Sequence, residues 1–183
     1  APAIVVAFDA FLSEKLTPIE AAARDLGVAD VAEATEAFAS GLRMLRSLLV
    51  ATGSCKKPKD ADWPKLLGPV LELGQKAQKA CDNRSEYFQN RKAAAEALNV
   101  VTLATAAAPP MHVQNVLESM DFHAIKVMQK KNDKETAWIK ALKALVKDLK
   151  DWCSEECKLG LAWSPSGQDP VGYFAAAPLG SGA

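Results

Sequence analysis

The chain has few of the residue types on which catalytic and metal sites depend. Its 183 residues include 2 histidines and 4 cysteines, and aromatic residues make up 7% of the total. His112 and His123 lie too far apart on one predicted helix to share a metal ion through helical spacing. Cys153 and Cys157 are one helical turn apart, but no second pair at ligand spacing accompanies them. We interpret them as thiols packed at the base of a helical bundle.

The motifs that identify common enzyme classes are also missing. The sequence has no glycine-rich phosphate loop, no G-x-S-x-G nucleophile elbow and no H-E-x-x-H zinc motif. The four tryptophans fall on apolar stripes or at helix ends, which is typical of core residues rather than of a cofactor site. We therefore expect no enzymatic activity, no cofactor and no metal, and we expect the function to lie on the surface.

Net charge and long apolar runs are absent as well. The 22 basic and 22 acidic residues cancel, so no overall field attracts nucleic acid or anionic lipid. No run of about 18 apolar residues predicts a membrane span, and the apolar start lacks the basic leader of a signal peptide. Four scattered cysteines indicate reduced thiols in a cytosolic protein. Because the chain starts without methionine, we expect it to be a piece of a longer protein.

What the sequence does contain is a strong helical periodicity in an alanine-rich chain that is 49% hydrophobic. The longest pattern runs from Lys134 to Lys158. Its large apolar residues recur at alternating steps of four and three and share one helix face, namely Trp138, Leu142, Leu145, Leu149 and Trp152. Asp133 is the predicted N-cap and Gly160 the predicted C-terminal stop. We expect this helix to be the central one of an all-helical bundle.

The same periodicity predicts the other helices. They span residues 5–16, continued after Pro18 as 18–26, then 30–49 capped by Asp30, then 63–81, 86–108 and 110–128. Short links predict antiparallel neighbours. We expect residues 1–163 to form one all-α bundle of five or six helices. Residues 164–183, rich in proline, glycine and alanine, are expected to be the disordered start of a flexible linker.

One polar connection is the best candidate for a binding surface. Between the second and third long helices, Lys56, Lys57 and Lys59 surround Pro58 and precede Asp60. Such a charge run is most often a solvated loop, so composition alone does not assign it a partner. Two further polar groups follow helix ends, namely Arg84, Ser85, Glu86, Asn90, Arg91 and Lys92, and then Lys126, Lys130 and Lys131. Since 63–81 is about one bundle length, we expect the first two groups near opposite ends.

Several segments, in order and at matching spacing, resemble the N-terminal helical domain of cyclase-associated protein. They are Val6-Ala7-Phe8-Asp9, Leu48-Leu49 followed by Lys56-Lys57-Pro58, Leu66-Leu67-Gly68-Pro69, Arg84-Ser85 ahead of Phe88 and Asn90, Thr136-Ala137-Trp138-Ile139-Lys140, and the closing Gly160-Leu161-Ala162-Trp163-Ser164-Pro165-Ser166-Gly167. The resemblance covers about residues 3 to 167. The chain departs from the family pattern in lacking a tryptophan near 97–101, in a fifth helix poor in aromatics, and in Cys157 where a histidine is common.

The resemblance implies an antiparallel six-helix bundle that works on actin in the cytoplasm. In that family the domain cooperates with cofilin, binds cofilin-decorated actin and promotes filament disassembly and monomer recycling. A segment outside this chain contacts adenylyl cyclase in some lineages. The implied partner-binding residues are Lys56, Lys57, Pro58, Asp60, Arg84, Ser85 and Asn90. The alternatives are a helical scaffold that forms a homodimer without binding actin and, ranked last, a metal enzyme built on the cysteines and histidines.

Overall fold

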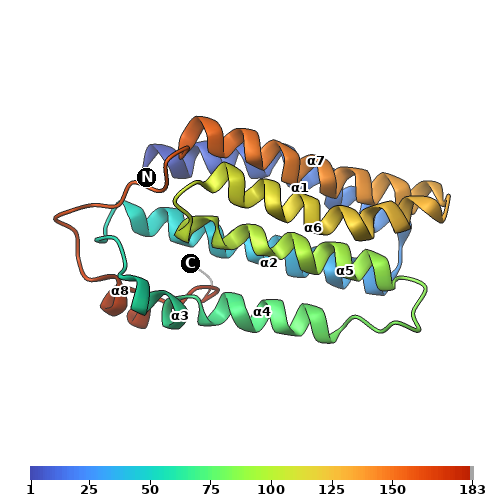
Figure 1. Cartoon of the computed structure of the whole chain (residues 1–183), viewed down its shortest axis with the longest axis horizontal. Helices are drawn as coiled ribbons and strands as arrows, with labels where there is room; N and C mark the ends of the chain where they lie inside the picture. Colours follow the sequence, from blue (N-terminus) through green and yellow to red (C-terminus); the bar gives the residue numbers. More distant parts are fainter. Residues whose placement is uncertain (182–183) are drawn as a thin grey trace.

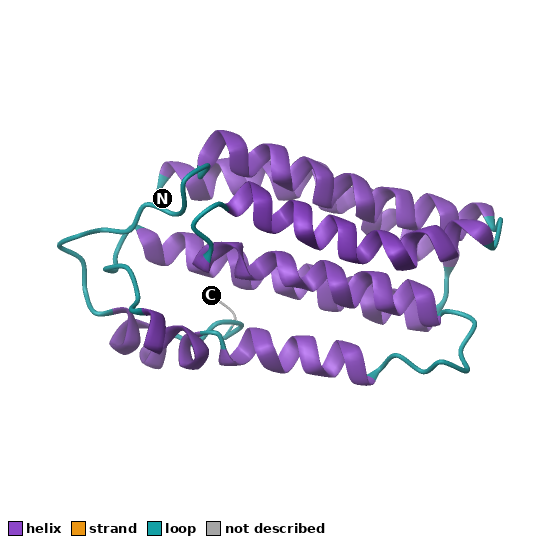
Figure 2. Cartoon of the chain, viewed as in Figure 1, coloured by secondary structure: helices purple, strands orange, loops and turns teal. Residues whose placement is uncertain are grey.

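The computed structural model describes residues 1–181, and within them the chain folds without a β-strand (Figure 2). Eight α-helices and two 3-10 helices follow one another in the order α1 (Ala3–Leu26), α2 (Ala29–Thr52), η1 (Asp60–Asp62), α3 (Trp63–Leu66), α4 (Gly68–Lys79), α5 (Phe88–Ala97), η2 (Leu98–Thr105), α6 (Pro109–Gln129), α7 (Asp133–Glu156) and α8 (Pro170–Ala176). The predicted all-α class is confirmed, but the count of helices exceeds the expected six. No helix within residues 1–181 combines the length and the apolarity needed to cross a membrane.

The long helices run antiparallel, and the connections gather at the two ends of an elongated bundle (Figure 1). The apolar stripe predicted for α7 is confirmed, because Trp138, Leu142 and Leu145 are at most 1% exposed. However, α7 lies along one edge and packs against α1, α5 and α6, whereas α2 packs against α1, α4, α5 and η2. The prediction that α7 is the central helix is therefore wrong. Small buried residues of α2, such as Ala39 and Gly41, let neighbours approach it from several sides.

Pro18 does not interrupt the first helix, which runs unbroken from Ala3 to Leu26. The prediction of two segments fails because Pro18 lies on the exposed face, where a carbonyl left without its helical N–H partner can bond water. Phe11 and Ile19, on either side of the proline, are both buried. Packing of the apolar face thus outweighs the local cost of the proline.

Two predicted helices are divided in the structure. The predicted helix 63–81 is split at Leu67, because Pro69, in the first turn of α4, has no N–H to continue the hydrogen bonds of α3. The predicted helix 86–108 tightens from α5 into the 3-10 helix η2. In η2 the hydroxyls of Thr102 and Thr105 donate to the carbonyls three residues earlier, at 2.9 and 3.0 Å.

Three of the predicted helix ends differ in detail. The N-cap of α7 is Asn132 rather than Asp133, and its side chain accepts from the Glu135 N–H at 3.0 Å. α2 begins at Ala29, so Asp30 lies inside the first turn, and its carboxylate reaches another helix instead of capping its own. α7 ends at Glu156, before Gly160, which has a left-handed φ of 111° in the following turn.

The C-terminal segment differs most from expectation. Residues 164–183 were predicted to be a disordered linker, but residues 170–176 form α8, and Phe174 and Leu179 are 5% and 4% exposed. Asp169 caps α8 by accepting from the Val171 N–H at 3.2 Å, and Pro170 occupies its first turn. The segment therefore folds back onto the bundle up to residue 181. Residues 182–183 of the predicted linker lie outside the described residues.

Candidate partner-binding site

The segment Cys55–Asp60, here called the basic loop, leaves α2 at one end of the bundle (Figure 1). The helix ends in a turn in which the Ser54 and Cys55 N–H groups both donate to Ala51 O, at 3.0 and 2.9 Å. Cys55 is fully buried, and Pro58 is also buried. Cys55 packs within the hydrophobic core and so anchors the loop, and this burial also raises the pKa of its thiol. The loop is thus attached to the core at two points.

Between and after these anchors the lysines point outward. Lys56, Lys57 and Lys59 are exposed, as is Asp60. Within residues 1–181 none of the three lysines takes part in an ion pair. Three lysines without an ion-pair partner within residues 1–181 therefore stand close together on an anchored backbone, which also carries Asp60. This arrangement suits recognition of an acidic protein surface. The buried Pro58 is less accessible to a partner than the lysines around it.

Arg84 and Ser85 lie at the opposite end of the bundle, between α4 and α5 (Figure 1). Arg84 folds back on Asp82, with Nε 3.1 Å from Oδ1, and this contact lowers the pKa of Asp82. Its guanidinium remains exposed. The structure thus separates the two predicted groups, as their spacing along the chain indicated. A single small partner surface cannot contact both groups at once.

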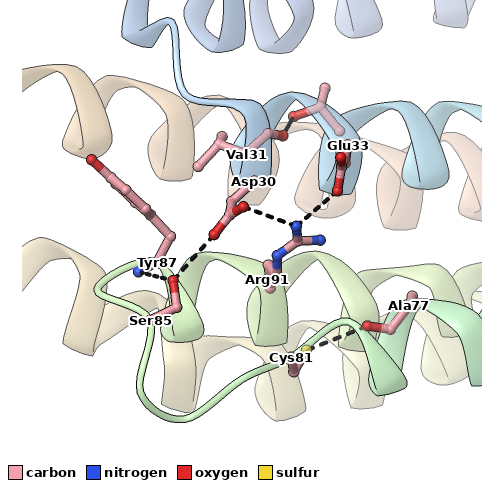
Figure 3. A network of polar contacts seen from close by, with 9 residues as sticks. Asp30, Val31, Glu33, Ala77, Cys81, Ser85, Tyr87 and Arg91 are labelled. Carbon is pink, nitrogen blue, oxygen red and sulfur yellow. Dashed lines mark hydrogen bonds and ion pairs between the residues drawn. The ribbon is translucent and has the colours of Figure 1, made fainter.

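Ser85 belongs to a polar network that joins the start of α2 to α5 (Figure 3). Its hydroxyl donates to Asp30 at 3.1 Å and accepts from the Tyr87 N–H at 3.1 Å. Arg91 donates to Asp30 at 3.1 Å and to Glu33 at 2.8 Å. The Ser85 hydroxyl therefore donates one hydrogen bond and accepts one inside the protein, and these bonds help to position the loop before α5.

Asn90 is not on the surface. Its side chain is fully buried, and neither its amide nitrogen nor its oxygen has a hydrogen-bond partner within residues 1–181. The prediction that Asn90 contacts a partner is therefore wrong. The sequence pattern failed here because Asn90 lies in the polar run 89–92, whereas α5 turns this one position toward the core.

The third basic group, Lys126, Lys130 and Lys131, lies at the end of α6. Lys130 donates to the Glu86 carbonyl at 2.7 Å, pairs with the buried Glu135 and lies over the Tyr87 ring. Lys126 lies over the exposed Phe122 ring, 4.2 Å from its centroid. Lys130 is thus engaged in the fold, which leaves the basic loop as the more available cationic surface.

The metal-enzyme alternative depends on how the cysteines and histidines lie in the structure. Among the described residues, no group of three His, Cys, Asp or Glu side chains could hold a metal ion. Cys153 and Cys157 are buried thiols, and the hydrogen bond from Cys153 lowers the pKa of Cys157. His112 Nε2 lies 2.8 Å from Asn99 O, and His123 Nδ1 lies 2.6 Å from Gln89 Oε1, so each histidine has a separate local partner.

Residues of the C-terminal segment that support the basic loop were not predicted from the sequence. Gln168 forms a parallel bridge with Cys55, and the Ser164 N–H donates to Cys55 O at 2.9 Å. The sequence does contain two features that indicate an ordered C-terminal segment. Asp169-Pro170 is a helix-start pair, and Tyr173-Phe174 is an aromatic pair that a solvated linker does not require.

Comparison with known families gives a match over most of the chain. The family model described as "CAP, N-terminal domain" matches residues 8–161. The chain is 26% identical over 169 residues to adenylyl cyclase-associated protein 1 of Mus musculus and 26% identical over 176 residues to cyclase-associated protein 1 of Arabidopsis thaliana. These alignments cover 89% and 90% of this chain but 35% and 37% of the relatives. The chain therefore spans about a third of the length of these relatives.

Solved structures share the fold. The N-terminal domain of CAP, in a crystal structure that "indicates variable oligomerisation", aligns with a TM-score of 0.83 at 21% identity, covering 93% of this chain and 95% of the other. The N-terminal domain of the adenylyl cyclase-associated protein from Dictyostelium discoideum aligns with a TM-score of 0.82 at 21% identity, covering 91% and 97%. At this level of identity the likeness establishes the architecture alone.

Proposed function

Because this chain belongs to the CAP N-terminal domain family, we propose that it is an actin-regulatory domain that binds cofilin-decorated actin and promotes filament disassembly and monomer recycling. The observation that carries the proposal is the family match over residues 8–161, which includes the basic loop. The partners are actin and cofilin in the cytoplasm. Contact with adenylyl cyclase is expected from a segment outside this chain.

The physical support comes from the basic loop. Its exposed lysines are free of ion pairs within residues 1–181, so a partner's carboxylates need not displace an internal acid. The buried Cys55 and Pro58 restrict the backbone that carries these lysines. A restricted loop loses less conformational entropy on binding than a mobile one. Positive charge at the end of an elongated bundle also steers encounter with an acidic protein such as actin.

A second candidate function is a helical scaffold that forms a homodimer and does not bind actin. It is favoured by exposed apolar residues on α6, where Phe122 is 59% and Ile125 is 46% exposed. The related CAP structure that "indicates variable oligomerisation" is consistent with self-association in that protein. This candidate and the first are not exclusive, but only the first requires the basic loop.

A filament disassembly assay distinguishes the two functions. Fluorescent actin filaments are followed by microscopy with cofilin alone, with this protein alone, and with both. We expect faster shortening only when both are present. Sedimentation equilibrium is run in parallel on the wild type and on Phe122→Gln. No acceleration by the wild type, together with a dimer that Phe122→Gln weakens, would favour the scaffold and exclude the first proposal.

A further inference from the structure

The C-terminal residues 164–181, here called the clamp, are hydrogen-bonded to the end of α2 and to the start of the basic loop. The Lys56 N–H donates to Gln168 O at 3.0 Å, and the Gln168 N–H donates to Ser54 O at 2.9 Å. The Ser164 N–H donates to Cys55 O at 2.9 Å, and its hydroxyl donates to Thr52 O at 2.9 Å. Four hydrogen bonds therefore join two segments that are more than a hundred residues apart along the chain.

Two of these bonds, at Cys55 and Lys56, constrain the backbone of the basic loop itself. Ser54 and Cys55 donate back to α2, and the next backbone bond within the loop is from the Asp62 N–H to Lys59 O at 2.9 Å. Between the turn at Ser54–Cys55 and the turn at Lys59–Asp62, the Lys56 N–H donates its hydrogen bond to the clamp. Without the clamp, Lys56 and Lys57 would stand on a stretch connected to the protein only through its ends and through the buried Pro58.

Gly167 shows how closely the clamp and the loop approach each other. A Cβ atom at this position would lie 2.6 Å from Ser54 O and 2.9 Å from Cys55 Cα. Both are backbone atoms, so no side-chain rotation could relieve the contact. Any residue larger than glycine must therefore push the clamp away from the loop or distort the end of α2.

The rest of the clamp is anchored to the bundle by apolar packing. The rings of Trp163, just before the clamp, and Trp63 meet edge to face, with centroids 5.9 Å apart. Phe174 of α8 is 5% exposed and lines surface hollows together with Val50 of α2 and Leu66 of α3. Burial of the Phe174 ring removes apolar surface from water and so favours the docked clamp.

We propose that residues 164–181 act as an intramolecular clamp that fixes the backbone of Cys55–Lys57 in the conformation recognised by an acidic protein partner. The clamp is thus part of the binding end of the bundle instead of the first part of a linker. The binding role rests on the proposed function, because it assumes that the basic loop contacts actin bound to cofilin. The structural role of the clamp does not depend on that assumption and is measured separately.

The test compares Gly167→Ala with the matched control Gly172→Ala. Gly172 lies on α8 within the same clamp, but a Cβ atom at this position would meet nothing within 4 Å. Phe174→Ala is a second route to the open clamp, because it removes the anchor without touching the loop. Three readouts are recorded, namely hydrogen exchange of the Lys56 amide, maleimide labelling of Cys55 located by mass spectrometry, and co-sedimentation with cofilin-bound actin.

In Gly167→Ala and Phe174→Ala we expect Lys56 exchange to become faster by a factor on the order of ten, and Cys55 to become reactive, while the α7 amides remain protected. The dissociation constant for cofilin-bound actin should rise by a factor of roughly three to ten, as for Lys56→Ala/Lys57→Ala. Gly172→Ala should match the wild type in all three measurements.

Each of the other outcomes contradicts one stated part of the proposal. Unchanged exchange and labelling in both clamp variants would show that the clamp does not constrain the loop. Faster exchange with unchanged binding would remove its role in recognition and leave the proposed function standing. A wild type that does not bind cofilin-bound actin would contradict the proposed function, and the clamp would then be retained or rejected as a structural element on exchange and labelling alone.

Discussion

The indole Nε1 of Trp138 donates a hydrogen bond of 2.9 Å to the Thr35 hydroxyl, and both side chains are buried. Thr35 in turn donates to Val31 O at 2.7 Å, so the indole of α7 is tied to the backbone of α2. By contrast, the buried Trp152 Nε1 has no partner within residues 1–181. The Trp138–Thr35 bond therefore fixes how α7 and α2 face each other across the core.

Replacing Thr35 by valine should lower the free energy of unfolding by about 1–3 kcal/mol, because the shape is kept while a buried indole N–H loses its acceptor. The measurement is urea unfolding followed by tryptophan fluorescence and circular dichroism. Thr17→Val is the control, since the Thr17 hydroxyl is exposed and bonds only within its own helix. Equal stability of Thr35→Val and the wild type would show that the bond contributes nothing net.

Replacing Lys56 and Lys57 by alanine should leave the thermal midpoint unchanged, because neither side chain is buried or paired within residues 1–181. Binding to cofilin-bound actin should weaken by a factor of roughly three to ten, with a larger loss at low salt, where charges are less screened. Co-sedimentation at two salt concentrations provides the measurement.

The control for this prediction is Lys140→Ala/Lys147→Ala, which removes the same charge from two exposed positions on α7. If both double variants weaken binding equally, overall charge rather than the basic loop determines the affinity. If neither variant weakens it, the basic loop is not part of the actin-binding surface.

Replacing Asn90 by leucine should stabilise the protein by about 1 kcal/mol, because a buried amide without partners is exchanged for an apolar side chain of similar size. Leucine also has the higher helix propensity in α5. Chemical unfolding gives the stability, and the same sample should bind cofilin-bound actin as the wild type does. A less stable variant would indicate that a buried water satisfies the Asn90 amide. Weaker binding to cofilin-bound actin would show that Asn90 contributes to the partner-binding site.

The ion pair between Asp9 of α1 and Arg46 of α2 should make part of the stability depend on pH. Arg46 Nε lies 2.6 Å from Asp9 Oδ1 and Nη2 lies 3.0 Å from Oδ2, and these hydrogen bonds hold the pKa of Asp9 below its ordinary value of 3.8. A carboxyl whose pKa is lower in the folded state stabilises it above the unfolded pKa, and this contribution disappears as the pH falls through the folded pKa.

Asp9→Asn should therefore cost less than about 1 kcal/mol at pH 7, since both side chains are more than a third exposed and solvent screens the pair. The difference from the wild type should vanish below the lowered pKa of Asp9. Urea unfolding from pH 7 down to pH 2.5 is the measurement, with Arg46→Met as the partner variant in a double-mutant cycle. A difference that stays constant with pH would mean that the effect arises from packing instead of charge.

The basic loop illustrates what sequence can and cannot assign. Three lysines around a proline identified an exposed cationic segment, and the structure places Lys56, Lys57 and Lys59 in solvent. A polar run by itself gave no means of telling the buried Asn90 from its partly exposed neighbours. Which residue of such a run turns inward depends on the rotation of the whole helix about its axis. Ser85 was recognised as polar, but its use inside the fold depends on Asp30, which is distant in sequence.

The sequence by itself determined the all-helical class, the buried stripe of α7 and the exposed position of the lysines, because these follow from periodicity, propensity and charge that act within a few residues. The tertiary structure alone decided that Pro18 stays inside α1, that α2 rather than α7 contacts most elements, and that residues 164–181 dock beside Cys55. These features depend on packing between segments far apart in the chain, where burial and backbone pairing outweigh local preference.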